Sequence, residues 1–133
     1  MRYAAQTKVP VAKSRMEIEN TINRYKAEQF GIALSKDKAM IQFRISTWLV
    51  RFILPLPADE QSQRQRWRAL ALVLKAKLEA VESKITTLEE EFEAHIVMPD
   101  GKTVHEHLAS KLKEIQASGH IPQDLLPDYR KEK

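Results

Sequence analysis

Residues 63–68 read Gln-Arg-Gln-Arg-Trp-Arg, a basic cluster whose side chains could bind nucleic acid. If this run opens a helix, its side chains can reach phosphates or base edges, and a helix N-terminus itself favours phosphate. The candidate nucleic-acid contacts are Arg64, Arg66, Arg68 and Lys75. Arg64 and Arg68 share a helix face, whereas Arg66 points elsewhere. The alternative is a solvated or intramolecular role for these charges.

Histidines and acids gather late in the chain, at Glu93, His95, His105, Glu106 and His107. A metal ion needs ligands that converge at about 2 Å. On one helix His105 and His107 lie about 200° apart, so they cannot share an ion there. His95 could join one of them only if the intervening turn folds back. We therefore expect surface histidines, no metal site and no cofactor, with a metal-dependent enzyme as a remaining alternative.

Nucleophilic catalysis has little support in this sequence. No serine sits in a glycine-flanked elbow, and the absence of cysteine excludes a thiol nucleophile and disulfides. Three glycines are too few to build a phosphate-cradling loop. We expect no catalytic residues and no enzymatic activity.

Composition narrows the class of protein. The 133 residues are 43% hydrophobic and 30% charged, which is typical of a folded domain. Lys and Arg number 22 against 18 Asp and Glu, a mild basic excess that permits an acidic partner without requiring one. No apolar run approaches the roughly 18 residues of a membrane span, and the first twenty residues lack a signal-peptide core. A cytoplasmic protein without a membrane partner is expected.

The elements that position these side chains begin with a short strand and a helix. Alternating residues over 2–11 predict an edge strand ending near Pro10. Ser14 and Glu17 have the spacing of a capping box, which predicts a helix over 15–26 with Ile18 and Ile22 on its apolar face.

Period-two patterns then predict an antiparallel meander of three strands. The segments are 30–34, 40–45 and 48–54, separated by the polar turn 35–38 and the short turn 46–47. Both faces of the last segment are apolar except at Arg51, which favours a central or doubly covered strand.

A long helix over 61–93 follows, because this stretch has no glycine or proline. Its apolar residues recur at alternating spacings of four and three, the heptad pattern of a helix–helix seam. The predicted oligomer interface is Leu74, Leu78, Val81, Ile85 and Leu88. In a parallel pair, Lys77 would face Glu82 and Lys84 would face Glu89. The alternative is that the same stripe packs on the sheet or on the C-terminal helix. Basic residues occupy the start of this helix and acidic residues its end, opposite to the helix dipole.

A second capping box, Thr103 with Glu106, predicts a C-terminal helix that Gly119 ends. The fold class is therefore α+β, with a single domain over 1–118 and an extended tail over 119–133 whose Leu125 and Leu126 dock against the protein. From Ser14 on, the order helix, three strands, helix is similar to that of double-stranded-RNA-binding domains. The long helix over 61–93, which completes that order, is longer than its counterpart in those domains and lacks their clean basic signature.

Three stretches resemble a family of small uncharacterised proteins encoded by tailed bacteriophages and prophages. The first comprises Val50 to Pro57, Gln65 to Leu70 and Lys75 to Glu82, the second is Glu90 to Val104, and the third is Lys8 to Val11. The similarity extends to about Leu126. The resemblance implies a bacterial host cytoplasm and a small accessory role in phage DNA metabolism or in interference with a host system. It supplies no catalytic residues.

Together these patterns favour a non-enzymatic phage accessory protein that binds a macromolecule and self-associates. Nucleic acid is the first candidate partner, through the basic start of the long helix. The alternative is an inhibitor of a host defence protein, bound through the acidic end of that helix or through the tail.

Overall fold

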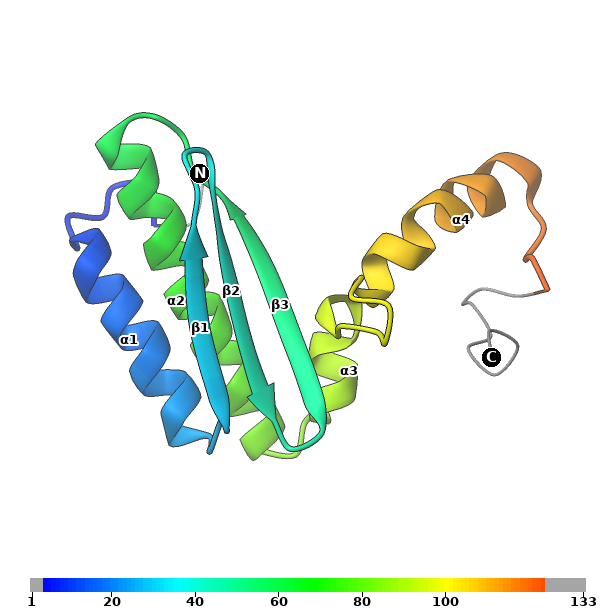
Figure 1. Ribbon diagram of the computed structural model, residues 1–133, viewed down its shortest axis with the longest axis horizontal. Helices are drawn as coiled ribbons and strands as arrows, with labels where there is room; N and C mark the ends of the chain where they lie inside the picture. Colours follow the sequence, from blue (N-terminus) through cyan, green and yellow to red (C-terminus); the bar gives the residue numbers. More distant parts are fainter. Residues whose placement is uncertain (1–3, 124–133) are drawn as a thin grey trace.

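The computed structural model describes residues 4–123 (Figure 1). The elements in chain order are α1 (Val11–Arg24), β1 (Gln29–Leu34), β2 (Lys38–Ile45), β3 (Trp48–Pro55), α2 (Glu60–Glu82), α3 (Leu88–Phe92), the 3-10 helix η1 (Glu93–His95) and α4 (Val104–Ser118). The predicted α+β class, with a three-stranded antiparallel meander and a C-terminal helix, is confirmed. Within the described residues, no helix is both long and apolar enough to cross a membrane. The expected docking of Leu125 and Leu126 lies outside the described residues.

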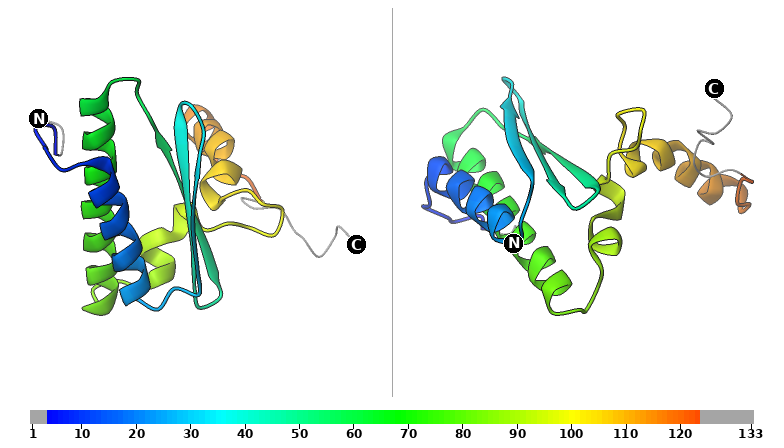
Figure 2. Two further views of the ribbon diagram at one scale, coloured as in Figure 1. Left: turned by 60° about the vertical axis from the view of Figure 1, so that its left-hand side comes forward. Right: turned by 60° about the horizontal axis from the view of Figure 1, so that its bottom comes forward.

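The sheet has the strand order β1-β2-β3, and α1 and α2 cover the same face of it (Figure 2). In register, Ile32 lies beside Ile41, and Ile41 beside Phe52, so alternate residues of all three strands share the helix-covered face. This face packs on Ile18 and Ile22 of α1 and on the inner face of α2. The inner residues of α2 are Trp67, Leu70, Ala71, Leu74 and Leu78. The apolar periods of the sequence thus become one core between two layers.

The predicted N-terminal strand is wrong for the described part of that segment. Ala4 to Thr7 form a turn, in which the amide of Thr7 donates to the carbonyl of Ala4 at 3.1 Å. The Gln61 side-chain amide donates to the carbonyls of Ala5 and Thr7, at 3.3 and 2.9 Å. Because these backbone groups bond to the start of α2, the segment lies across that helix and adds no strand to the sheet.

Helix α1 begins at Val11, four residues earlier than predicted. Pro10 is its N-cap, and Ser14 is fully buried on the inner face of the helix. The predicted capping box of Ser14 and Glu17 is therefore wrong. No side chain caps this end of the helix; the carbonyl of Pro10 accepts from the amides of Lys13 and Ser14, at 3.1 and 3.2 Å.

Strand β3 is an edge of the sheet and β2 is central, so the predicted central position of β3 is wrong. The segment after η1 covers the outer edge of β3: Val50 forms an isolated bridge with Ile96, and the amide of Val97 donates to the carbonyl of Leu49 at 2.8 Å. Arg51 donates to the carbonyl of Gly101 at 2.9 Å. This segment covers part of the outer edge of β3, whereas Ile53 on the same strand remains 48% exposed.

The unbroken helix predicted over 61–93 is also wrong, because α2 ends at Glu82. Lys84 adopts the left-handed region, with φ of 63°. The amide of Ile85 donates to the carbonyl of Ala80, and that of Lys84 to the carbonyl of Val81, at 3.0 and 3.1 Å. This pattern is a Schellman motif, which closes a helix C-terminus. Thr87 then caps α3 by accepting from the amide of Glu90 at 3.1 Å.

Replacing Lys84 with glycine is expected to raise the free energy of unfolding by about 0.5–1 kcal/mol. Glycine adopts a positive φ without the Cβ clash that a lysine has there. The matched control is Lys75→Gly, an exposed lysine in the interior of α2, which should cost about 1 kcal/mol. Urea denaturation of both variants measures the difference. Equal destabilisation by both would contradict the left-handed helix end.

Helix α4 confirms the predicted C-terminal helix. Its N-terminus has the complete Thr103–Glu106 capping box, and Gly119 ends it with φ of 75°. Its N-terminal end lies beside η1, and the helix extends as an arm away from the sheet and α2 (Figures 1 and 2).

Candidate nucleic-acid interface

Three of the four predicted basic contacts share one face of α2. Asp59 caps this helix by accepting from the amide of Ser62 at 2.8 Å. At 100° per residue, Arg64, Arg68 and Lys75 fall within about 40° of one another around the helix axis. The apolar inner face of α2 is buried, so these cations lie at its side, along the line where it meets α1.

A groove of about 300 Å³ runs between α1 and α2. It is lined by Glu17, Asn20, Thr21 and Arg24 from α1 and by Arg68, Ala71, Leu72 and Lys75 from α2. Three of these side chains are cationic, one is anionic and none is aromatic. The groove therefore offers hydrogen-bond donors and net positive charge, the requirements of a phosphate-binding surface.

Arg68 forms an ion pair with Glu17 across this groove. Both side chains are partly exposed, so the pair contributes little to stability. It does hold the guanidinium at the groove, since a side chain tied at its end has fewer conformations. A phosphate that approaches Arg68 must share it with the Glu17 carboxylate.

Arg24 lies farther along the groove on α1. Its guanidinium donates to the Tyr25 hydroxyl at 2.9 Å, and this hydrogen bond raises the pKa of Arg24. Burial raises the pKa of the Tyr25 phenol, so this hydroxyl stays neutral at physiological pH. Arg24 therefore adds a permanent positive charge.

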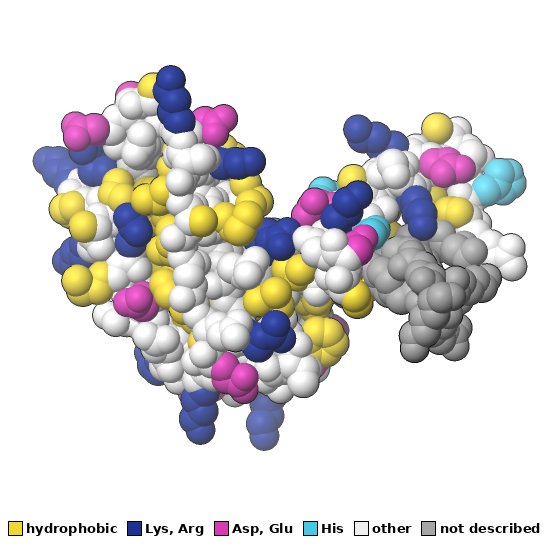
Figure 3. All heavy atoms as spheres, viewed as in Figure 1, with side chains coloured by type: hydrophobic (Ala, Val, Ile, Leu, Met, Phe, Trp, Pro, Cys, Tyr) yellow, Lys and Arg dark blue, Asp and Glu magenta, His cyan; other side chains and the backbone are white. Residues whose placement is uncertain are grey.

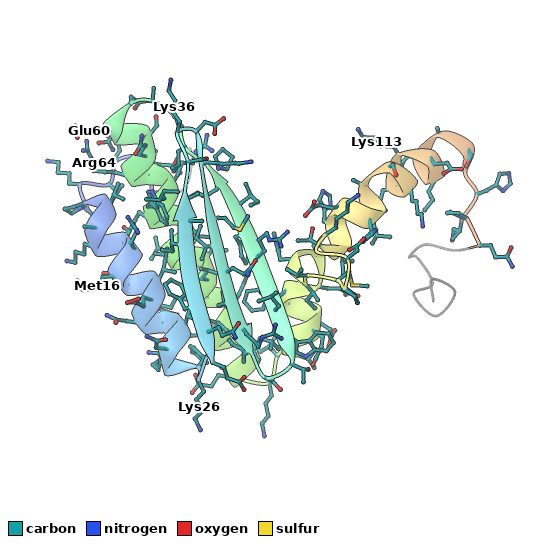
Figure 4. The ribbon with its side chains drawn as sticks, viewed as in Figure 1. Met16, Lys26, Lys36, Glu60, Arg64 and Lys113 are labelled. Atoms are coloured by element: carbon teal, nitrogen blue, oxygen red, sulfur yellow. The ribbon has the colours of Figure 1, made fainter. Side chains whose placement is uncertain are left out.

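A second groove, of about 360 Å³, follows at the start of α2. Lys8, Pro10 and Val11 line it together with Glu60, Gln63 and Arg64. Arg64 donates twice to Gln61 Oε1, at 3.2 and 2.6 Å, and lies 4.0 Å from the exposed Glu60 carboxylate. Arg64 and Glu60 project at the end of the molecule that also carries Lys36, in the turn between β1 and β2 (Figure 4). The two grooves together form a basic line along the α1–α2 side.

Arg66 does not join this line. It lies two residues from both Arg64 and Arg68, and a two-residue step turns about 200° around a helix. This places it on the same side of α2 as Lys77, which pairs with Glu91 of α3 at 3.3 Å. The structure thus separates Arg66 from the other predicted contacts, as the helical period requires.

The five predicted seam residues do not form one stripe. Leu74 and Leu78 are buried in the core of the chain itself, and Val81 is half-buried. Ile85 lies in the turn after α2 with 81% of its surface exposed, and Leu88 packs at the start of α3. The continuous seam is wrong because the helix breaks at 83–87. Self-association itself stays a prediction.

Two of the four charges predicted to face each other across that seam, Lys77 and Glu89, have partners within the chain. Lys77 pairs with Glu91, and Glu89 accepts a hydrogen bond from the Trp48 indole at 2.8 Å. A hydrogen bond from a backbone amide lowers the pKa of Glu89, and the hydrogen bond from Trp48 lowers it further. Both contacts tie α3 to its neighbours and favour the intramolecular interpretation of these charges.

The two ends of the predicted helix belong to different elements and carry opposite charge. Residues 1–82 contain 15 Lys and Arg against 8 Asp and Glu, whereas 83–133 contain 7 against 10. The basic excess therefore belongs to the sheet with α1 and α2, and the acidic excess to the chain from α3 onward. This division favours the α1–α2 side as the surface for a polyanion.

The late histidines and acids serve local contacts. The His95 ring stacks on Phe52 with centroids 3.9 Å apart, and burial lowers the pKa of His95. His107 lies 2.9 Å from the Asp100 carboxylate, whose pKa is lowered chiefly by the amide of Lys102. Glu106 belongs to the capping box, which lowers its pKa. Over residues 4–123 no three such side chains gather to hold a metal ion.

Sequence reasoning missed the α1 half of the groove and Lys8. Glu17, Asn20 and Arg24 recur at spacings of three and four, the signature of one helix face. That signal was available. Its meaning depends on α2, because this face becomes a groove wall only where the second helix lies against it.

Comparisons with protein-family models, with curated proteins and with solved structures give no match. The resemblance to phage proteins therefore stays a prediction.

Proposed function

We propose that this protein is a non-enzymatic phage accessory protein that binds the phosphate backbone of duplex nucleic acid. The observation that carries the proposal is the groove between α1 and α2, where Arg24, Arg68 and Lys75 meet. Arg64 and Lys8 extend the same line at the start of α2. Arginine and lysine that neutralise phosphates supply most of the affinity of sequence-independent binding.

A duplex fits this surface better than a single strand does. Proteins that bind single strands stack bases on exposed aromatic side chains, and the two grooves have none among their lining residues. Trp67, the aromatic residue within the basic run, is 1% exposed. Contact with the phosphates of a duplex needs only cations and hydrogen-bond donors.

The length of the basic line also suits a duplex. From Arg64 to Lys75 the helix advances eleven residues, about 16 Å at 1.5 Å per residue. A DNA duplex carries about ten phosphate charges over that axial distance. Three to four simultaneous contacts are therefore within reach of the line. The Glu17 carboxylate beside Arg68 lowers the net charge, so moderate affinity is expected.

Salt-dependent binding tests this function. The probes are a labelled 20-base-pair RNA duplex, a DNA duplex of the same sequence and the single strands, each titrated by fluorescence anisotropy from 50 to 200 mM salt. RNA is included because the order of elements is similar to that of double-stranded-RNA-binding domains. With three to four contacts, the log–log slope of DNA affinity against salt should be about −3 to −4.

Two results would overturn the proposal. One is the absence of duplex binding at 100 µM protein and 50 mM salt. The other is binding that salt does not weaken, since apolar anchors would then carry it. The second result would favour the alternative function, an inhibitor of a host protein.

A further inference from the structure

Strand β1 has an outer edge that no other segment covers within residues 4–123. It stands at one end of the strand order β1-β2-β3. Just beyond β1, the amide of Ser35 donates to the carbonyl of Lys38 at 2.9 Å, which fixes the alternation of the antiparallel ladder. In that alternation the odd-numbered residues of β1 bond to β2. The N–H and C=O groups of Phe30, Ile32 and Leu34 therefore point outward, where nothing in the described chain meets them.

This edge lacks the features by which proteins protect the ends of a sheet. Lysine, proline, a β-bulge or a covering segment normally blocks further pairing. The six residues of β1 include no charged residue and no proline, and the register of β1 with β2 is continuous. A Cβ at Gly31 would meet no atom of residues 4–123 within 4 Å, so no side chain overhangs the backbone there. The sheet is thus open to extension beside β1.

A groove of about 490 Å³ runs along this edge, between α1 and β1. Its lining residues are Ala12, Arg15, Met16 and Glu19 from α1 and Phe30, Gly31 and Ile32 from β1. The four α1 residues occupy one flank of the helix, opposite to the flank that lines the α1–α2 groove. Met16 is 62% exposed (Figure 4), and Leu34, at the end of β1, is 55% exposed. Figure 3 shows hydrophobic side chains between α1 and the sheet.

We propose that this groove binds an extended segment of another protein, which adds to the sheet as a fourth strand antiparallel to β1. Only an extended backbone can bond to alternate residues of a strand edge. Phe30, Ile32 and Leu34 each offer one donor and one acceptor, six hydrogen bonds in all. Every second side chain of the added strand would face α1 and cover Met16.

The charges of the groove specify the partner segment further. Arg15 and Glu19 lie one helical turn apart, about 6 Å along the axis. Residues i and i+2 of a strand share a face and lie about 6.7 Å apart. An acidic residue and a basic residue at that spacing therefore match Arg15 and Glu19. Because α1 and β1 run in opposite directions (Figure 1), a strand antiparallel to β1 follows α1, and its acidic residue comes first.

A single strand suits this edge better than a second copy of the chain. Helix α1 lies beyond β1, outside the edge of the sheet (Figure 1). Paired strands lie about 4.8 Å apart, whereas packed helices need about 8–10 Å. Pairing β1 with β1 of a second copy would force both α1 helices into the same space. The groove also lies on the opposite flank of α1 from the α1–α2 groove, so this proposal is independent of nucleic-acid binding.

Two labelled peptides of equal composition test the charge pattern. Val-Thr-Asp-Thr-Lys-Thr-Val places the acidic residue first, and Val-Thr-Lys-Thr-Asp-Thr-Val reverses the order. By fluorescence anisotropy the first should bind about fivefold to tenfold more tightly, since two exposed ion pairs become two repulsions. The double variant Arg15→Glu with Glu19→Arg keeps the net charge and should reverse this preference. Circular dichroism checks that the variant is folded. An unchanged preference in the variant would overturn the proposal.

Backbone methylation of the first peptide tests strand addition itself. N-methyl groups on Asp and Lys remove two hydrogen bonds to β1 and should weaken binding at least about tenfold. The matched control carries N-methyl groups on the two inner threonines, whose N–H groups point away from β1, and it should bind as the unmodified peptide does. Equal binding of both methylated peptides would contradict an added strand.

Amide hydrogen exchange by NMR places the peptide on the chain. The amides of Phe30, Ile32 and Leu34 should gain protection when the first peptide is added, whereas those of Gly31 and Ala33 already bond to β2 and should not change. Three results would overturn the proposal: no binding at 1 mM peptide, binding that leaves all these amides unchanged, or protection of the three outward amides in the concentrated protein without peptide. The last result would indicate a dimer through β1.

Discussion

The double variant Arg64→Glu with Arg68→Glu is expected to weaken duplex binding at least about 100-fold at 100 mM salt. Each substitution removes one phosphate contact and puts a carboxylate in its place on the α1–α2 side. Lost contacts also reduce the dependence on salt, so the log–log slope should become shallower by about two. Fluorescence anisotropy over a salt series measures both effects.

Arg66→Glu is the matched control for that variant. It makes the same change in charge on the same turns of α2, but on the side away from α1. Its effect should be several-fold at most, through net charge alone. Equal loss of binding in Arg66→Glu and in Arg64→Glu would show that the α1–α2 groove is not the contact surface.

Replacing Phe92 with alanine is expected to lower the free energy of unfolding by about 3–5 kcal/mol. Phe92 is fully buried and meets Phe43 and Phe52 edge to face, with ring centroids 5.8 and 6.2 Å apart. The Lys77 ammonium lies 5.7 Å from its ring centroid. Phe92 is thus the anchor by which α3 closes the core, and alanine would leave a cavity there. Urea denaturation followed by circular dichroism measures the loss.

Ile85→Ala provides the comparison. In the heptad pattern Ile85 and Phe92 occupy equivalent positions, so an unbroken helix in a seam predicts similar costs for both. The structure places Ile85 in an exposed turn, and its replacement should change stability by no more than about 0.5 kcal/mol. Comparable destabilisation by the two substitutions would contradict the break after α2.

Local signals in the sequence were sufficient for most elements. The strands 29–34, 38–45 and 48–55 follow from alternation with period two, and α4 follows from its capping box and Gly119. These signals are reliable because strand alternation and helix caps depend on residues within a few positions of one another.

The break after α2 also has a local cause in the sequence, the capping residue of α3. Thr87 and Glu90 have capping-box spacing inside the heptad pattern, and Thr87 indeed caps α3. The absence of glycine and proline suggested continuity. Lys84 nevertheless adopts the left-handed conformation, because the two hydrogen bonds of the helix end and the burial of Phe92 outweigh its cost of about 1–2 kcal/mol.

By itself the sequence determined the class of the fold, the strands and the shared face of Arg64 and Arg68. Only the tertiary structure decided that Glu17 meets Arg68 from 51 residues away and that β3 is an edge. It also decided that Leu74 and Leu78 face the core of their own chain. The physical reason is that a periodic pattern in the sequence shows which residues form an apolar face. The hydrophobic effect is non-directional, so the pattern does not show which other surface will cover that face.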